Sequence, residues 1–167
     1  IYAIFAIILW STLGVGFKLA VNGLNNFSVT YFVTLFATIF LFISITIKKK
    51  LFKTFKILKK NLIYFIIVGI IGLGIHPLLY TKGYSLLSAS NTVAIFYSYP
   101  IFMILLSSIF FKDKLSFNST ICLLIGFIGV IILVTKGNLS DFNLNSGIIY
   151  TLLAALTWAF FSVIIKY

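Results

Sequence analysis

Long apolar segments separated by short polar connections dominate this chain of 167 residues. A bilayer core of about 30 Å is crossed by roughly 20 residues of α-helix, which satisfies its own backbone hydrogen bonds where water is absent. Six segments reach this length and are apolar on all sides, unlike the alternating strands of a membrane barrel. The pattern predicts six membrane-spanning helices, over residues 1–21, 28–47, 61–81, 84–111, 115–135 and 146–167.

The first and last of these segments carry the same motif. Its two copies are Tyr2, Ala6, Trp10 and Lys18 in the first segment, and Tyr150, Ala154, Trp158 and Lys166 in the last. A duplicated unit is the simplest cause of this repetition. The unit would hold five predicted helices, and because five is odd, the two copies would cross the membrane in opposite directions, as in inverted-repeat transporters.

Composition supports a membrane protein: 62% of the residues are hydrophobic and 9% are charged. The formal net charge is +11, which in a soluble protein would suggest nucleic-acid binding. Such binding needs a solvated basic face on a folded module, and no soluble module is predicted here. We therefore expect an all-α polytopic membrane protein whose surroundings are the lipid bilayer and which has no nucleic-acid partner.

The lysines predict the orientation. Seven of them crowd one connection, between the second and third predicted helices: Lys48, Lys49, Lys50, Lys53, Lys56, Lys59 and Lys60. The positive-inside rule places this connection, residues 48–60, in the cytoplasm of a multi-pass protein of the cell membrane. The segment is either a topology determinant alone or an interfacial segment, in which each lysine near an anionic leaflet contributes about 1 kcal/mol.

Several chemistries lack the residues they need. The chain has one Cys (Cys122), one His (His76) and no Glu, and its two acids, Asp113 and Asp141, lie in predicted connections. These residues cannot form a zinc site, a disulfide or a Cys/His catalytic pair within the chain. We expect no catalytic residues, no metal site, no cofactor and no enzymatic activity.

His76 is the leading candidate for a functional residue. It lies deep in the third predicted helix beside Pro77, and an ionisable side chain at that depth is expected to face a partner or a water-filled cavity. Pro77 has no N–H to donate, which predicts a kink and a freed carbonyl at Leu73. Two interpretations stay open: His76 handles substrate or protons, or it is a neutral side chain hydrogen-bonded to a neighbouring helix.

Other polar and aromatic residues could complete a cavity wall with His76. Trp10 lies at mid-depth of its helix, Tyr80 follows His76 by one turn, and Asn91 and Ser98 are spaced to share a helix face. The predicted substrate-binding residues are His76, Tyr80, Trp10, Asn91 and Ser98. Each could instead serve interhelical packing. Lys18, near the outer end of the first helix, either extends to the interface or contacts an ion or substrate.

A set of motifs in fixed order resembles the EamA-type members of the drug/metabolite transporter superfamily. The motifs are the Trp-containing first helix ending at Lys18, Ser88-Ala89-Ser90, Pro100, Asp113-Lys114-Leu115, Gly126-x2-Gly129 and the restart at Trp158. Asp113 stands where the family tends to have glutamate. The resemblance covers nearly the whole chain and identifies it as the amino-terminal portion of such a protein.

The resemblance implies ten helices in two inverted five-helix repeats around a central cavity. Residues 1–136 would form the first repeat, and residues 146–167 would be the first helix of a truncated second repeat. It implies a secondary transporter, an exporter or permease, that moves a small-molecule metabolite by alternating access. We expect these residues to need the second half of the same chain for transport. The alternative is a non-transporting membrane assembly or anchoring subunit.

Overall fold

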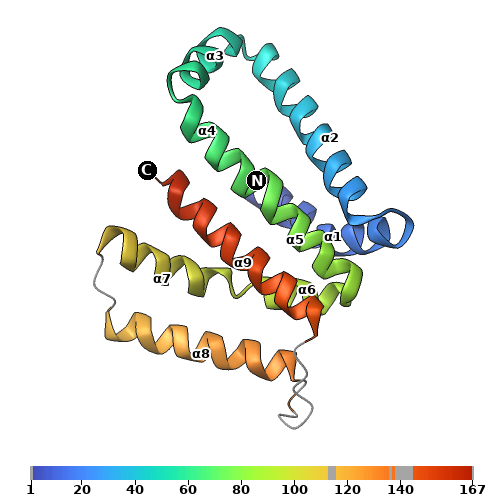
Figure 1. Cartoon of the computed structure of the whole chain (residues 1–167), viewed down its shortest axis with the longest axis vertical. Coiled ribbons are helices and arrows are strands. Elements are labelled where there is room, and N and C mark those ends of the chain that lie inside the picture. The colour runs from blue at the N-terminus through green and yellow to red at the C-terminus, as the bar shows by residue number, and fades with distance from the viewer. Residues whose placement is uncertain (1, 113–115, 136, 138–144, 167) are drawn as a thin grey trace.

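The computed structural model describes residues 2–112, 116–135, 137 and 145–166. All regular secondary structure within these residues is helical (Figure 1). The helices are α1 (Tyr2–Gly23), α2 (Asn26–Ile47), α3 (Leu51–Lys60), α4 (Leu62–Gly69), the π-helix η1 (Ile70–Ile75), α5 (His76–Leu86), α6 (Ala89–Phe96), α7 (Tyr99–Phe111), α8 (Phe117–Val134) and α9 (Ser146–Ile165).

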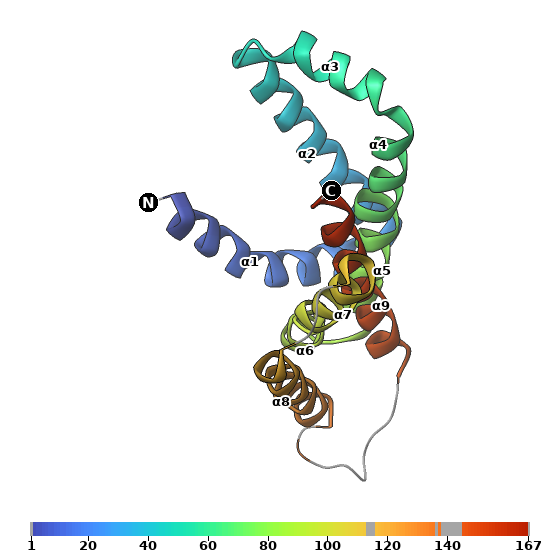
Figure 2. The ribbon, with the colours of Figure 1, turned by 90° about the vertical axis from the view of Figure 1, so that its left-hand side faces the viewer.

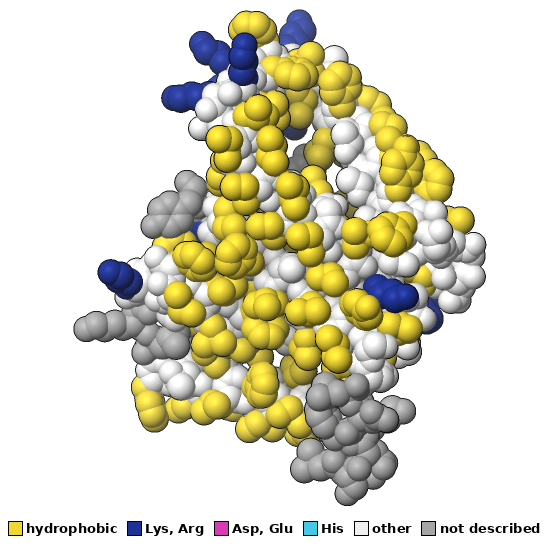
Figure 3. Space-filling view, in the orientation of Figure 1, with side chains coloured by type: hydrophobic (Ala, Val, Ile, Leu, Met, Phe, Trp, Pro, Cys, Tyr) yellow, Lys and Arg dark blue, Asp and Glu magenta, His cyan; other side chains and the backbone are white. Residues whose placement is uncertain are grey.

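Five continuous or nearly continuous helical stretches are long and apolar enough to cross a membrane. They are Ala3–Gly23, Asn26–Ile47, Leu62–Leu86, Ala89–Phe111 and Ser146–Ile165, and a shorter apolar stretch covers Phe117–Ile132. Yellow hydrophobic side chains cover most of the face shown in Figure 3. Together with the helical secondary structure, this confirms the predicted all-α polytopic membrane protein.

The boundary between the third and fourth spans differs from the sequence prediction. The third span runs through α4, η1 and α5 as far as Leu86, so Tyr84 belongs to it and not to the fourth span. Leu87 is extended (φ −120°, ψ 167°), which ends α5. The Ser88 hydroxyl then accepts a hydrogen bond from the Asn91 N–H at 3.3 Å and caps α6. Hydrophobicity alone could not locate this turn, because polar residues are scattered over both sides of it, from Thr81 to Thr92.

α9 packs closely against the third span, and the two run in opposite directions. The Tyr64 hydroxyl donates to the Ile164 carbonyl at 3.3 Å near one end, whereas Gly83 faces Thr151 near the other. A Cβ atom on Gly72 would overlap the Phe161 ring. Small residues therefore allow the close approach of these helices. Three alanines of α9 are fully buried: Ala154, Ala155 and Ala159.

The remaining helices surround this central pair. Both α1 and α2 contact α5. Both α6 and α7 contact α9, and α8 contacts α6 and α7. Figures 1 and 2 both place α3 at one end of the molecule, between the end of α2 and the start of α4. Asp113 and Asp141 lie outside the described residues. The duplication of a five-helix unit stays a prediction.

Candidate functional site

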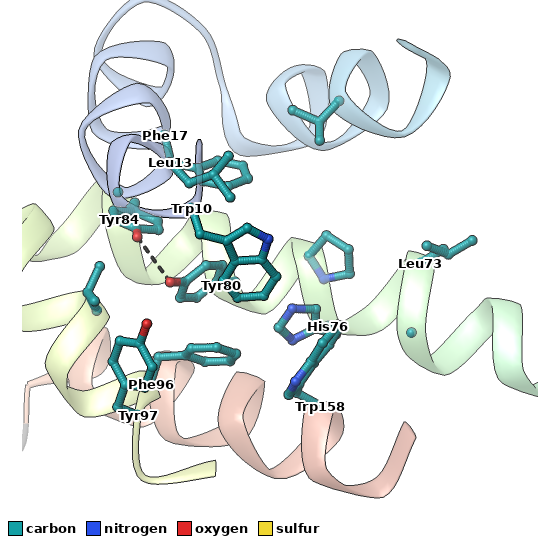
Figure 4. A pocket seen from close by; sticks show the side chains of 15 residues that line it. Trp10, Leu13, Phe17, Leu73, His76, Tyr80, Tyr84, Phe96, Tyr97 and Trp158 are labelled. Atoms are coloured by element: carbon teal, nitrogen blue, oxygen red, sulfur yellow. Dashed lines mark hydrogen bonds between the residues drawn. The ribbon is translucent and has the colours of Figure 1, made fainter. Parts of the chain in front are cut away.

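A cavity of about 250 Å³ lies among α1, the third span, α6 and α9. Figure 4 shows that its walls are largely aromatic. The rings that line it include those of Trp10, Phe17, His76, Tyr80, Phe96 and Trp158. These residues come from helices far apart in the sequence, so the cavity exists only when the helices are assembled.

A π-helical turn positions His76 in the cavity wall. The N–H of His76 donates to the carbonyl of Ile71, five residues earlier, at the end of η1. Pro77, which cannot donate, falls in the first turn of α5, where a missing N–H is tolerated. The expected interruption beside Pro77 is thus a change of hydrogen-bond register, a feature often found at functional sites. A freed carbonyl at Leu73 stays a prediction.

His76 is 8% exposed and is held by both a hydrogen bond and ring contacts. Its Nδ1 lies 3.1 Å from the Ala154 carbonyl oxygen of α9. Because a carbonyl can only accept, Nδ1 must carry the proton in this bond, and Nε2 of the neutral ring is then an acceptor. The His76 ring centroid lies 4.8 Å from that of Trp158 and 5.5 Å from that of Phe96. The neighbouring helix α9 therefore engages Nδ1 of His76, as expected if this residue is a neutral side chain hydrogen-bonded to a neighbouring helix.

Two tyrosine hydroxyls bring further polar atoms to the aromatic wall. The hydroxyls of Tyr80 and Tyr84 are 3.0 Å apart, shown by the dashed line in Figure 4. Phe17 of α1 stacks on Tyr84 with ring centroids 5.5 Å apart and an interplanar angle of 16°. The Tyr80 ring also lies 4.5 Å from Phe96 by centroids. The wall thus combines large ring faces with a few hydrogen-bonding groups.

Lys18 connects α1 to the carboxyl end of the third span. Its Nζ donates to the carbonyls of Tyr84 and Leu87, each at 2.8 Å. Carbonyls at the end of a helix lack intrahelical partners and carry partial negative charge, so they favour a cation. Two of the three ammonium protons are therefore engaged by backbone. Contact of Lys18 with an ion or substrate stays a prediction.

The structure brings three of the five predicted substrate-binding residues together at this cavity. Trp10, His76 and Tyr80 line it, whereas Asn91 and Ser98 do not. Residues seven apart share a face only on a continuous helix, and the turn at Tyr97 and Ser98 separates α6 from α7. Ser98 is 2% exposed, and its hydroxyl has no hydrogen-bond partner within the described part of the chain.

Sequence reasoning did not nominate Trp158, Phe17, Tyr84 or Phe96 as cavity residues. The repeated motif could have found Trp158, because it occupies the same register as Trp10, and both tryptophans line the cavity. No such signal marks Phe96, which is one of nineteen phenylalanines.

Comparison with known proteins identifies the family. Residues 1–135 match the model of the EamA-like transporter family. A protein of Archaeoglobus fulgidus named "Uncharacterized transporter" is 27% identical over 154 residues, which cover 92% of this chain and 53% of the relative. The chain thus spans about half the length of that relative, and no solved structure matches it significantly. This integral, multi-pass membrane protein belongs to the EamA-like transporter family.

Proposed function

We propose that the complete protein is a secondary transporter that moves a small metabolite, as an exporter or permease, by alternating access between two inverted repeats. The observation that carries this proposal is the aromatic cavity beside an interrupted helix. His76 lies there next to the π-turn, at the contact between the third span and α9. Helices interrupted at mid-membrane are typical of transporter binding sites.

The position of α9 supports a site between repeats. In the proposed arrangement α9 is the first helix of the second repeat, and transporter sites lie at the interface of two repeats. Trp10 and Trp158, equivalent in the repeated motif, both line the same cavity. The second half of the chain, the proposed partner of these helices, would enclose the cavity further.

The lining favours a solute with little net charge and an aromatic or amine group. No Asp, Glu, Lys or Arg side chain is among the described residues that line the cavity. Ring faces of Trp10, Phe96 and Trp158 can contact an aromatic group, or a cation through its attraction to a ring face. Nε2 of His76 can accept one hydrogen bond from the solute, and the Tyr80 and Tyr84 hydroxyls can exchange others.

The orientation follows from the lysines. We place the connection of residues 48–60 in the cytoplasm of a cell-membrane protein, because it holds more lysines than any other connection in the sequence. The first span would then run outward and α9 inward. Lys18 would stabilise the outer end of the third span.

Transport by purified complete protein in liposomes tests the proposal. Vesicles would be loaded with zwitterionic, aromatic and amine solutes, and flux would be measured under imposed solute and proton gradients without ATP. We expect flux of at least one solute, reduced on the order of tenfold by Trp158→Ala, the loss set by removal of a ring contact. Absence of flux for every solute, together with a complete structure that has a dry, closed centre, would indicate a non-transporting subunit.

A further inference from the structure

α3 lies at a corner between two membrane spans. α2 ends at Ile47, and a short turn with Lys49 in the left-handed region (φ 54°) leads into α3 at Leu51. At the other end, Asn61 (φ −122°, ψ 37°) separates α3 from α4, which begins the third span. Since a span ends on one side of α3 and the next begins on the other, α3 lies at the membrane–water boundary.

The two sides of α3 differ in chemistry. At 100° per residue, Leu51, Phe55 and Leu58 share one side, and Lys53, Lys56 and Lys60 share the opposite side. No residue of α3 is buried in the protein, and Phe52 is 85% exposed. A helix with these two faces is suited to the plane of the interface, with apolar side chains among the acyl chains and lysines toward the headgroups.

A groove runs between α3 and the start of α4. It is open, has a volume of about 630 Å³, and is lined by Phe52, Phe55, Lys56, Leu58, Lys59 and Leu62, which we call the α3 groove. Apolar side chains form most of it, and Lys56 and Lys59 are the two charged residues that line it. Figure 3 shows dark-blue lysines gathered at this end of the molecule.

The positive charge of the α3 groove has no acidic residue near it in the sequence. The first acidic residue of the chain is Asp113, so residues 1–112 offer no carboxylate to pair with Lys56 or Lys59. A ligand that complements the groove must therefore carry an anion and an apolar portion together. A phospholipid with net negative charge has both, and it is the amphiphile that surrounds such a corner.

We propose that the α3 groove binds one anionic phospholipid of the adjacent leaflet. Lys56 and Lys59 hold its phosphate, and an acyl chain lies against Phe55, Leu58 and Leu62. This binding differs from general attraction to a charged bilayer, because it depends on two particular lysines beside an apolar groove. It also does not require the cavity or the transport activity proposed above.

Quenching by brominated lipids can measure this binding in the protein reconstituted into vesicles. A fluorophore would be attached at Asn61→Cys, next to the groove, in a Cys122→Ser background. Vesicles would mix phosphatidylglycerol and phosphatidylcholine of the same chain length, with one or the other brominated. A second label at Leu24→Cys, in the connection at the other end of α2, is the control: it measures quenching by lipid at a position away from the α3 groove.

We expect the label at position 61 to report phosphatidylglycerol bound on the order of 30-fold more tightly than phosphatidylcholine, the contribution of two lysines near anionic lipid. Lys56→Gln/Lys59→Gln should bring this ratio close to 1. Lys49→Gln/Lys50→Gln removes the same charge outside the groove and should change the ratio by less than about threefold. The label at position 24 should show a ratio near 1.

Equal quenching by both lipids at position 61 would overturn the proposal. So would an equal loss in the two double variants, which would show a general surface potential without a site. Displacement of the lipid by millimolar inorganic phosphate or glycerol phosphate would assign the groove to a soluble anion. Quenching that falls as protein density in the vesicles rises would assign it to a second copy of the chain. Unchanged tryptophan emission would confirm that the variants are folded.

Discussion

The Nδ1 atom of His76 lies 3.1 Å from the carbonyl oxygen of Ala154, joining the start of α5, directly after the π-helix, to the middle of α9. The same carbonyl accepts the Thr157 hydroxyl at 2.9 Å. In the proposed alternating-access mechanism, the third span and α9 belong to different repeats. The contact between His76 and Ala154 therefore lies where the two repeats would move relative to one another. This makes His76 the most informative residue to replace.

Variants of His76 separate its contact with α9 from contact with a solute. His76→Ala removes the donor, and we expect the free energy of unfolding in detergent to fall by about 1 kcal/mol. His76→Asn places an amide N–H near the position of Nδ1 and should recover most of this loss. Asn has no group at the position of Nε2, so transport by the complete protein should remain reduced in both variants.

A different pattern would revise the role of His76. Wild-type uptake, export and pH dependence in His76→Ala would show that the histidine serves packing alone. Recovery of transport by His76→Asn to the wild-type level would show that only the bond to Ala154 matters. Unfolding curves and transport rates would be measured on the same preparations.

Gly72→Ala tests the close packing of the third span on α9. The added Cβ would overlap the Phe161 ring, and overpacking of this kind costs about 1–3 kcal/mol. Gly69→Ala is a matched control one turn earlier, since a Cβ there meets nothing within 4 Å. We expect the first variant to lower the unfolding midpoint in a denaturant titration, and the second to leave it unchanged or raise it slightly.

The double variant Gly72→Ala/Phe161→Ala checks the cause. If the Phe161 ring is the obstacle, the two substitutions should be non-additive, with the double variant more stable than the sum of the single effects predicts. Additive losses would show that Gly72 matters for another reason.

Lys18→Met tests the connection between α1 and the end of the third span. It keeps the length of the side chain and removes two hydrogen bonds from a charged donor, each contributing about 1.5–3 kcal/mol to stability at most. We expect a clear fall in the unfolding midpoint. Lys82→Met removes the same charge from the neighbouring helix and should have a smaller effect. Equal effects of the two variants would show that charge alone, and not the capping of the carbonyls of Tyr84 and Leu87, is responsible.

Intrinsic fluorescence should report occupancy of the cavity. The only two tryptophans of the chain, Trp10 and Trp158, both line it, so an aromatic or amine solute bound there should change their emission. Within residues 1–167, Trp10→Phe and Trp158→Phe each leave a single reporter. We expect saturable changes with the same dissociation constant in both variants. A saturable change from only one tryptophan would place the solute outside the shared cavity.

Cysteine labelling tests the proposed opposite directions of the first span and α9. In a Cys122→Ser background, membrane-impermeant reagents should label Leu24→Cys and Ser146→Cys from outside intact cells. Lys53→Cys should react only after the cells are opened. Labelling of Leu24→Cys and Ser146→Cys from opposite sides would contradict the inverted arrangement and the transporter proposed from it.

The amino-acid sequence by itself determined the membrane character of the chain and the approximate position of its apolar helices, but not the boundary between the third and fourth spans. Long apolar runs leave the backbone no alternative to helix in lipid, because its polar groups must be satisfied internally. Pro77 also located the interruption beside His76, although only the folded structure showed its form as a π-turn. The repeated motif marked Trp10 and Trp158 as equivalent.

Only the tertiary structure decided which of these side chains meet. Asn91 and Ser98 had the spacing of a shared face, but the turn at Tyr97 and Ser98 interrupts the helix between them, and neither residue lines the cavity. Nor could a sequence that is 62% hydrophobic reveal which apolar side is packed and which faces lipid, since both sides look alike. Contacts such as His76 with Ala154 depend on glycine and alanine allowing two distant helices to approach, a property of the assembled pair and not of either segment.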